Sequence, residues 1–293
     1  TLDGYTEDEK VAIARDHLLP RQRERAGLEP GEVTVSDDAL HAIVGGYTRE
    51  AGVRSLERAL AKVLRKAAAR VAETPGQTVD VDGDVVADLL GRPRYLDTDI
   101  ADRLAVPGVA TGLAVTGAGG DVLFVETTTL PAEGADDPER SGLTVTGQLG
   151  DVMQESARIA LSYVRAHREQ LGIPEGADRR HVHVHFPAGA VPKDGPSAGI
   201  TMTTALVSLF TGRPVKPTVG MTGEVTLQGR VLPIGGVKQK LLAAHRAGLT
   251  EIILPARNEA DLDDVPEAVR SRLTIHLATD VADVVRWALQ PAA

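Results

Sequence analysis

The chain has 293 residues, of which 42% are hydrophobic and 25% charged, a profile typical of a globular protein with one large domain or two ordinary ones. Its net charge of −9 argues against general nucleic-acid binding, and its lack of cysteine excludes disulfides and thiolate metal sites. No apolar run reaches the roughly 18 residues that a membrane span needs. The first residue is Thr1 rather than methionine, so we expect a fragment or a processed product.

The first third of the chain is predicted to be mostly helical. Thr6 followed by Glu9 forms a capping-box pattern for a helix that runs to about Leu18. Ser36 precedes a second run of helical character, and apolar residues recur at helical spacing over Val53–Val71. Most of the basic residues between those apolar positions are expected to form a solvated face rather than a nucleic-acid contact: Arg54, Arg58, Lys62, Arg65, Lys66 and Arg70.

After Asp99 the pattern changes to strands that alternate with helices. Strands are predicted over residues 121–128, 143–146, 181–186, 251–254 and 273–276. Helices are predicted from Gln148 to about Arg168, around Glu259 and over Val281–Leu289. The apolar side of the first is expected to include Val152, Ile159, Ala160, Tyr163 and Val164. This alternation indicates an α/β or α+β fold.

A serine in a glycine- and proline-rich turn is the first candidate for chemistry. Ser197 lies in the segment Pro192–Gly199, directly before the apolar helical run Ile200–Phe210. A hydroxyl at a helix N-terminus lies among unpaired backbone N–H groups, which can stabilise an oxyanion and so suit a nucleophile. A serine in this position is more often a simple N-cap, so the turn alone does not decide its role.

A lysine that could act as the base follows in Leu232–Lys240. Gly235 and Gly236 permit a tight turn, after which Val237–Arg246 has helical character. A cation near a helix N-terminus is disfavoured, and burial beside apolar neighbours disfavours it further, so both effects lower the pKa of Lys240 toward that of a general base. Lys238 is the competing candidate, and it faces another way on the helix.

These two segments resemble the motifs of the Lon protease family. The sequence of Pro192–Gly199 resembles the nucleophile motif, and Pro233–Lys240 resembles the catalytic-lysine motif, whose second lysine is the base in the family. The resemblance continues through Gly147–Ser156, His183–His185 and Tyr47–Arg58, so it covers nearly the whole chain.

The resemblance implies two domains. Residues 1–91 are expected to form the all-α small subdomain of an AAA+ ATPase module, and residues 92–293 an α+β Lon-type serine–lysine peptidase domain. Arg54 matches the sensor-2 arginine, which in the family reaches the nucleotide phosphates; an exposed helix arginine is the alternative. Because the sequence contains no Gly-x4-Gly-Lys-Ser/Thr loop, we expect no autonomous ATP hydrolysis. Peptide hydrolysis by this chain should need no cofactor, whereas ATP and magnesium would serve the full-length protein.

The family also implies roles for individual residues. Ser197 would be the nucleophile and Lys240 the general base, with an oxyanion hole of backbone N–H groups around Ser197 and the loop before it. Five residues would support them. Thr222 would bond the lysine, Glu224 would orient the site or pair with another subunit, and Glu126 would lie beside the substrate groove; the alternatives are a strand-end hydroxyl, a plain salt bridge and an edge-strand carboxylate, respectively. His185 would support the site without acting as the base, and Asp194 would engage the lysine or cap a turn. A zinc site at His183 and His185 lacks a third ligand with convincing spacing, so no metal is expected.

The function that follows is an ATP-dependent endopeptidase of protein quality control, which degrades unfolded or damaged polypeptides. Full-length relatives form homo-hexameric rings, and the implied location is the bacterial cytoplasm. Weak DNA binding is a further expectation, since family members can contact DNA. Two rival functions are a non-catalytic Lon-like assembly module and a DNA-binding regulatory module.

Overall fold

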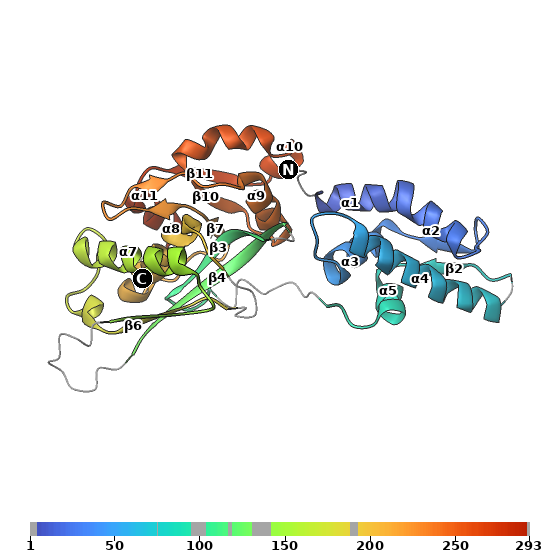
Figure 1. The fold of residues 1–293 in the computed structure, drawn as a ribbon, viewed down its shortest axis with the longest axis horizontal. Coiled ribbons are helices and arrows are strands. Elements are labelled where there is room, and N and C mark those ends of the chain that lie inside the picture. The colour runs from blue at the N-terminus through green and yellow to red at the C-terminus, as the bar shows by residue number, and fades with distance from the viewer. Residues whose placement is uncertain are drawn as a thin grey trace. The chain divides into compact units, whose positions relative to one another are not determined.

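The computed structural model describes residues 5–74, 76–94, 104–116, 119–130, 142–187 and 193–291. The chain divides into two compact units, one of Thr1–Thr98 with Gly117–Gly119 and one of Asp99–Thr116 with Gly120–Ala293 (Figure 1). Each unit has its own cluster of buried apolar side chains, as an independent domain requires.

The first unit is mainly helical, as predicted. Its helical segments are α1 (Glu7–Ile13), η1 (Ala14–Leu18), α2 (Leu19–Arg25), α3 (Asp37–Tyr47), α4 (Arg54–Glu73) and α5 (Gly83–Leu90). The predicted capping box is confirmed, because the Glu9 amide donates to Thr6 Oγ1 at 3.0 Å and the Thr6 amide donates to Glu9 Oε2 at 2.7 Å. The predicted cap at Ser36 is also confirmed, with its Oγ accepting from the Ala39 amide at 3.1 Å.

Two features of this unit differ from the prediction. The first helix does not end at Leu18, because a π-helical turn, η1, passes directly into α2. Pro20, which has no N–H to donate, lies directly after this turn, at the second residue of α2. Among the described residues, strands β1 (Val33–Val35) and β2 (Val79–Val81) also form a two-stranded parallel sheet, and three residues are too few to give a recognisable pattern.

The second unit is built on a mixed sheet that has seven strands within the described ranges. Their order is β11-β10-β7-β3-β4-β6-β5, with bounds β3 Val109–Thr116, β4 Gly119–Thr129, β5 Leu143–Thr146, β6 Val182–His185, β7 Val219–Met221, β10 Glu251–Pro255 and β11 Thr274–Ala278. All five predicted strands are present. Strands β3 and β7 were missed because glycine, alanine and threonine interrupt their apolar pattern.

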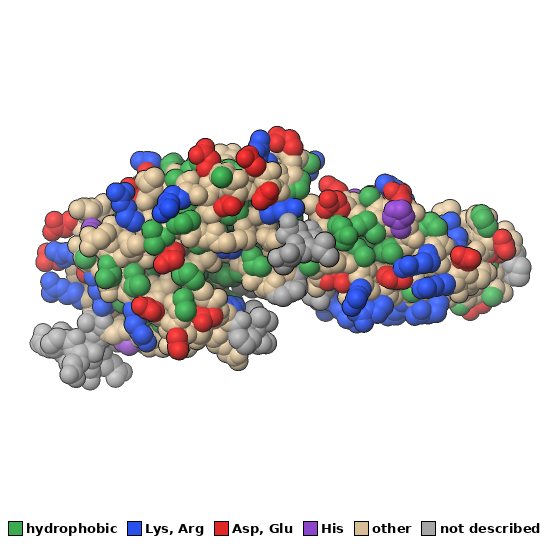
Figure 2. Space-filling view, turned by 45° about the horizontal axis from the view of Figure 1, so that its top comes forward, with side chains coloured by type: hydrophobic (Ala, Val, Ile, Leu, Met, Phe, Trp, Pro, Cys, Tyr) green, Lys and Arg blue, Asp and Glu red, His purple; other side chains and the backbone are tan. Residues whose placement is uncertain are grey.

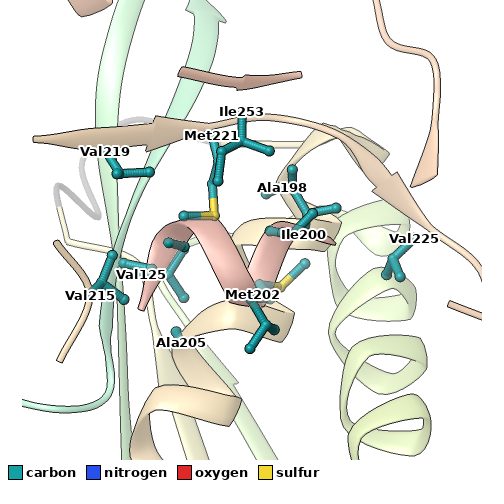
Figure 3. Packing of buried hydrophobic residues seen from close by; sticks show 14 of the residues in the cluster. Val125, Ala198, Ile200, Met202, Ala205, Val215, Val219, Met221, Val225 and Ile253 are labelled. Atoms are coloured by element: carbon teal, nitrogen blue, oxygen red, sulfur yellow. The ribbon is translucent and has the colours of Figure 1, made fainter. Parts of the chain in front are cut away.

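Helix α8 (Gly199–Thr211) lies in the core of this unit, where nearly all its residues are buried. Figure 3 shows Ala198 and Ile200 at its beginning, close to Met221 of β7 and Ile253 of β10. The remaining helical segments of this unit within the described ranges are α7 (Asp151–Ala166), η3 (Ala177–Arg179), η4 (Pro196–Ala198), α9 (Val237–Arg246), η5 (Ala256–Asp264), α10 (Glu267–Arg270) and α11 (Val281–Ala288).

Two details of α7 were predicted wrongly. The helix begins at Asp151 rather than Gln148, because Gln148 has a φ of +54° and so cannot belong to a right-handed helix. Val152 is 44% exposed, whereas Met153 and Ala157 point into the core. Each residue turns a helix by about 100°, so Val152 lies just off the buried stripe that includes Met153 and Ala157, whereas Ala160, Tyr163 and Val164 are buried as predicted.

None of the helices in the described ranges is both long and apolar enough to cross a membrane.

Candidate active site

Ser197 lies at the entrance to the buried helix α8. It is the middle residue of the 3₁₀ turn Pro196–Ala198, which leads directly into Gly199. The turn is fixed by backbone hydrogen bonds, because the Gly223 amide donates to the Ser197 carbonyl at 2.8 Å and the Ile200 amide donates to the Gly223 carbonyl at 3.0 Å. The half-buried Ser197 hydroxyl therefore lies at the start of a helix, as the sequence predicted.

Lys240 is the buried lysine of α9. Only 3% of its surface is exposed, and its Nζ donates a hydrogen bond to Thr222 Oγ1 at 3.0 Å. Burial disfavours the charged ammonium and lowers the pKa of Lys240 from 10.5 to about 8. Lys238, the competing candidate, is only partly buried. The structure therefore favours Lys240 over Lys238 as a group that can hold and release a proton near neutral pH.

Thr222 joins the lysine to the serine segment. It follows strand β7 directly and is fully buried. Its hydroxyl accepts from Lys240 Nζ and donates to the Ser197 carbonyl at 3.2 Å, so a single oxygen bridges the two predicted catalytic residues. Within the described ranges, the hydrogen bond of Lys240 Nζ goes to Thr222 and not to Ser197.

The two predicted glutamates lie on different strands of the second unit. Glu224 begins the hairpin of β8 (Glu224–Val225) and β9 (Val231–Leu232), directly after the segment that bonds the Ser197 turn. Glu126 lies in β4, opposite His185 of β6 in the antiparallel register. Both side chains are partly buried, and the structure brings neither into a hydrogen bond with Lys240.

The histidines of β6 are held by a threonine of β5. Thr146 Oγ1 lies 2.7 Å from Nδ1 of His185 and 2.8 Å from Nε2 of His183. One hydroxyl has one proton, so at least one of these rings must be the donor to Thr146. The described residues contain no group of three or more histidine, aspartate or glutamate side chains that could hold a metal.

Asp194 caps helix α7 in this structure. Its Oδ1 accepts from the Met153 amide at 3.0 Å and from the Gly195 amide at 2.9 Å. The N-cap position of α7 is Gly150, which has no side chain to cap the helix. A Cβ at Gly150 would lie 2.3 Å from Asp194 Cγ, so only glycine admits the carboxylate. Of the two roles expected for Asp194, the structure therefore shows the cap and no contact with Lys240.

Replacing Asp194 with alanine should destabilise the chain by about 1–2 kcal/mol, because the Met153 amide in the first turn of α7 and the Gly195 amide both lose their acceptor. Urea unfolding would measure this. Asp194→Asn is the matched control, since its amide oxygen can still accept from Met153, and it should retain most of the stability. An unchanged free energy of unfolding in Asp194→Ala would show that the cap is unimportant.

Some of the predicted features lie elsewhere. Arg54 is the exposed first residue of α4 in the first compact unit. Residues 188–192, which include part of the loop expected to contribute to the oxyanion hole, lie outside the described residues.

Sequence reasoning missed the glycines that permit close packing around the site. A Cβ on Gly199 would lie 2.8 Å from the Val225 amide nitrogen, and one on Gly150 would collide with Asp194. Neither has the positive φ of a turn glycine, so no turn pattern could have revealed them.

Comparison with known proteins identifies the family. A sequence model of the Lon protease (S16) C-terminal proteolytic domain matches residues 80–291. The chain belongs to the Lon protease family. A second model, of the Lon protease AAA+ ATPase lid domain, matches residues 24–79. These matches agree with the order of helical and peptidase regions, while the boundary predicted between residues 91 and 92 stays a prediction.

Three Lon proteases illustrate the similarity. That of Salinispora arenicola is 66% identical over 293 residues, which are 100% of this chain and 36% of the relative. Those of Mycolicibacterium smegmatis and Bacillus thuringiensis are 60% and 53% identical over 292 residues, in each case 99% of this chain and 36% of the relative. The chain therefore spans about a third of the length of these Lon proteases.

Proposed function

We propose that this chain hydrolyses peptide bonds with Ser197 as nucleophile and Lys240 as general base, as the peptidase part of an ATP-dependent endopeptidase. The observation that carries the proposal is the buried Lys240, whose pKa is lowered to about 8 and whose Nζ is linked through Thr222 to the Ser197 turn. At pH 7 roughly a tenth of such an amine is neutral, about 300-fold more than for a lysine with a pKa of 10.5.

The reaction would proceed through an acyl-enzyme. The neutral Lys240 amine takes the proton from Ser197 Oγ as that oxygen attacks the scissile carbonyl carbon. Backbone N–H groups near the start of α8 stabilise the oxyanion of the tetrahedral intermediate. When the C–N bond breaks, the leaving amine takes the proton from the Lys240 ammonium. Water then attacks the ester, again giving its proton to Lys240, and Ser197 regains a proton as the carboxylic product leaves.

The pH dependence of cleavage tests this assignment. With an unstructured fluorogenic peptide, kcat/KM should rise with pH through an apparent pKa of about 8 and level off above it, because only neutral Lys240 accepts the serine proton. A rise centred near pH 6.5, the ordinary pKa of histidine, would point instead to His183 or His185 as the base. If kcat/KM does not change between pH 6 and pH 10, no general base with a pKa in that interval takes part, and the assignment of Lys240 is contradicted.

The larger protein would use this site on unfolded or damaged polypeptides, as a homo-hexamer in the bacterial cytoplasm. Arg54 is chemically suited to a nucleotide phosphate, since its guanidinium is exposed at the first residue of α4. This chain contains no phosphate-binding loop, so in this proposal Arg54 contacts the ATP phosphates, and the magnesium ion is bound by other parts of the larger protein. In this proposal, peptide hydrolysis itself takes place without a cofactor.

DNA binding is a second candidate function, favoured by the exposed basic face of α4. Figure 2 shows basic side chains gathered along one side of the helical unit. The exposed members on α4 are Arg54, Arg58, Lys62, Arg65, Lys66 and Arg70. A steep loss of DNA affinity with added salt would support this function, since phosphate contacts release counterions. The net charge of −9 keeps it secondary to peptide hydrolysis.

A further inference from the structure

The end of the β3–β4 pair lies directly against the first turn of α9. Gly236, the N-cap of α9, has a φ of +73°, and a Cβ there would lie 2.6 Å from Cγ2 of Val115 in β3. Gly120 is the second residue of β4, and a Cβ there would lie 1.8 Å from the Gln239 carbonyl oxygen. A side chain at either glycine would therefore collide with its neighbour across the contact between these strands and the first turn of α9.

Gly120 contacts the peptide group that precedes the catalytic lysine. A Cβ on Gly120 would also lie 2.5 Å from the carbonyl carbon of Gln239, which is bonded to the Lys240 nitrogen, and 3.1 Å from Cβ of Ala243. The backbone of β4 and the backbone of α9 therefore pack together with no side chain between them. Protein interiors are close-packed, so a change at Gly120 must displace the helix rather than fill a void.

Arg246 holds the other end of the same helix to the same residue. In the last turn of α9, Arg246 Nη2 donates to the Gly120 carbonyl at 2.9 Å. Gly120 thus packs against the first turn of α9 and accepts a hydrogen bond from Arg246 in the last turn of that helix. On the other side, the Lys240 side chain donates to Thr222. The position of Lys240 is fixed between these two sets of contacts.

We propose that Gly120 is a positioning residue for peptide hydrolysis: its bare backbone sets how closely α9 approaches β4, and so where Lys240 Nζ lies relative to Thr222 and Ser197. This inference rests on the proposed role of Lys240. A methyl group at Gly120 would have to move α9 by roughly 1 Å, a displacement that can cost an active site on the order of 100-fold in rate.

The test compares Gly120→Ala with Gly45→Ala in the full chain. Gly45 in α3 is the matched control, because a Cβ there meets no atom within 4 Å and its φ is not positive. Gly120→Ala should lower kcat for a fluorogenic peptide by about 100-fold with little change in KM. It should also raise the pKa of Lys240 above about 8, measured by NMR of carbon-labelled lysine, because the displaced amine becomes more hydrated. Gly45→Ala should match the parent chain in both measurements.

A second variant keeps the test decisive if Gly120→Ala does not fold. Arg246→Met removes the hydrogen bond to Gly120 and should lower kcat several-fold. It should also raise the pKa of Lys240, as Gly120→Ala does. An unchanged kcat and an unchanged Lys240 pKa in the folded variants would overturn the inference. If that result is obtained and Lys240→Met is inactive, the positioning role of Gly120 is contradicted while the proposed role of Lys240 stands. If Lys240→Met is active, the proposed role of Lys240 is itself contradicted. The pKa measurement needs no turnover, so it applies even to a weakly active chain.

Discussion

Replacing Ser197 with alanine is expected to abolish cleavage of an unstructured fluorogenic peptide, by roughly 10⁴-fold or more. The change removes the oxygen that would form the acyl-enzyme, and no water in the same position could form that ester. Folding should be unaffected, because the turn is held by the Ser197 carbonyl, which accepts from the Gly223 amide and the Thr222 hydroxyl. Cleavage by the parent chain and the variant, measured without ATP, is the decisive comparison.

A serine-directed covalent reagent provides the control for a weakly active chain. Mass spectrometry should find the adduct on Ser197 in the parent chain and no adduct in Ser197→Ala. Ser208, on the same helix, is fully buried and bonds the Arg213 carbonyl, so Ser208→Ala serves as a matched serine variant that should still be labelled at Ser197. Undiminished cleavage by Ser197→Ala would identify a different nucleophile or a contaminating protease.

Replacing Lys240 with methionine should have two effects that point in opposite directions. Cleavage should fall by roughly 10²- to 10⁴-fold, because a positioned general base contributes about that much to rate. Stability at pH 7 should rise by up to about 3 kcal/mol, because methionine fills the buried site without placing a charge there. Thr222 is left with a partner, since its hydroxyl still donates to the Ser197 carbonyl.

The pH dependence of that stability gain follows from the lowered pKa of Lys240. Below about pH 8 the lysine is protonated in both the folded and the unfolded chain, so the folded state bears the full cost of burying it. Between about pH 8 and pH 10.5, Lys240 loses its proton in the folded state but keeps it in the unfolded state. The parent chain therefore becomes more stable as the pH rises, and the stability gained by Lys240→Met shrinks. Thermal unfolding at pH 7 and pH 10 measures the difference. A variant that keeps most of its activity, or that gains no stability at pH 7, would show that Lys240 is not a buried base.

Local chemistry explains why much of the helical unit could be predicted. A capping box needs only two side chains three residues apart, so Thr6 and Glu9 fix the start of α1 wherever the helix lies. The same holds for Ser36 and for the long apolar repeat of α4. The strands β1 and β2 were missed because their pairing joins residues more than 40 positions apart and leaves no local pattern.

The identity of the two candidate catalytic residues also came from the sequence. The turn around Ser197 and the helix start before Lys240 are local arrangements whose chemistry follows from backbone N–H groups and apolar neighbours. Helical spacing alone left Lys238 as a competitor, and the structure separates the two lysines by the burial of Lys240 and its hydrogen bond to Thr222. It also left open whether Asp194 engages the lysine or caps a turn, and its contact with the Met153 amide, 41 positions earlier in the chain, required the fold.

By itself, therefore, the sequence determined the helices whose caps and apolar repeats are local, and the pair Ser197 and Lys240 as candidates for chemistry. Tertiary structure decided what depends on distant segments meeting: the single threonine oxygen between Lys240 and Ser197, the burial that lowers the lysine pKa, and the bare backbone of Gly120 against α9. The physical reason is that a cap or an apolar repeat acts over three or four residues, whereas desolvation and close packing depend on every segment that surrounds a group.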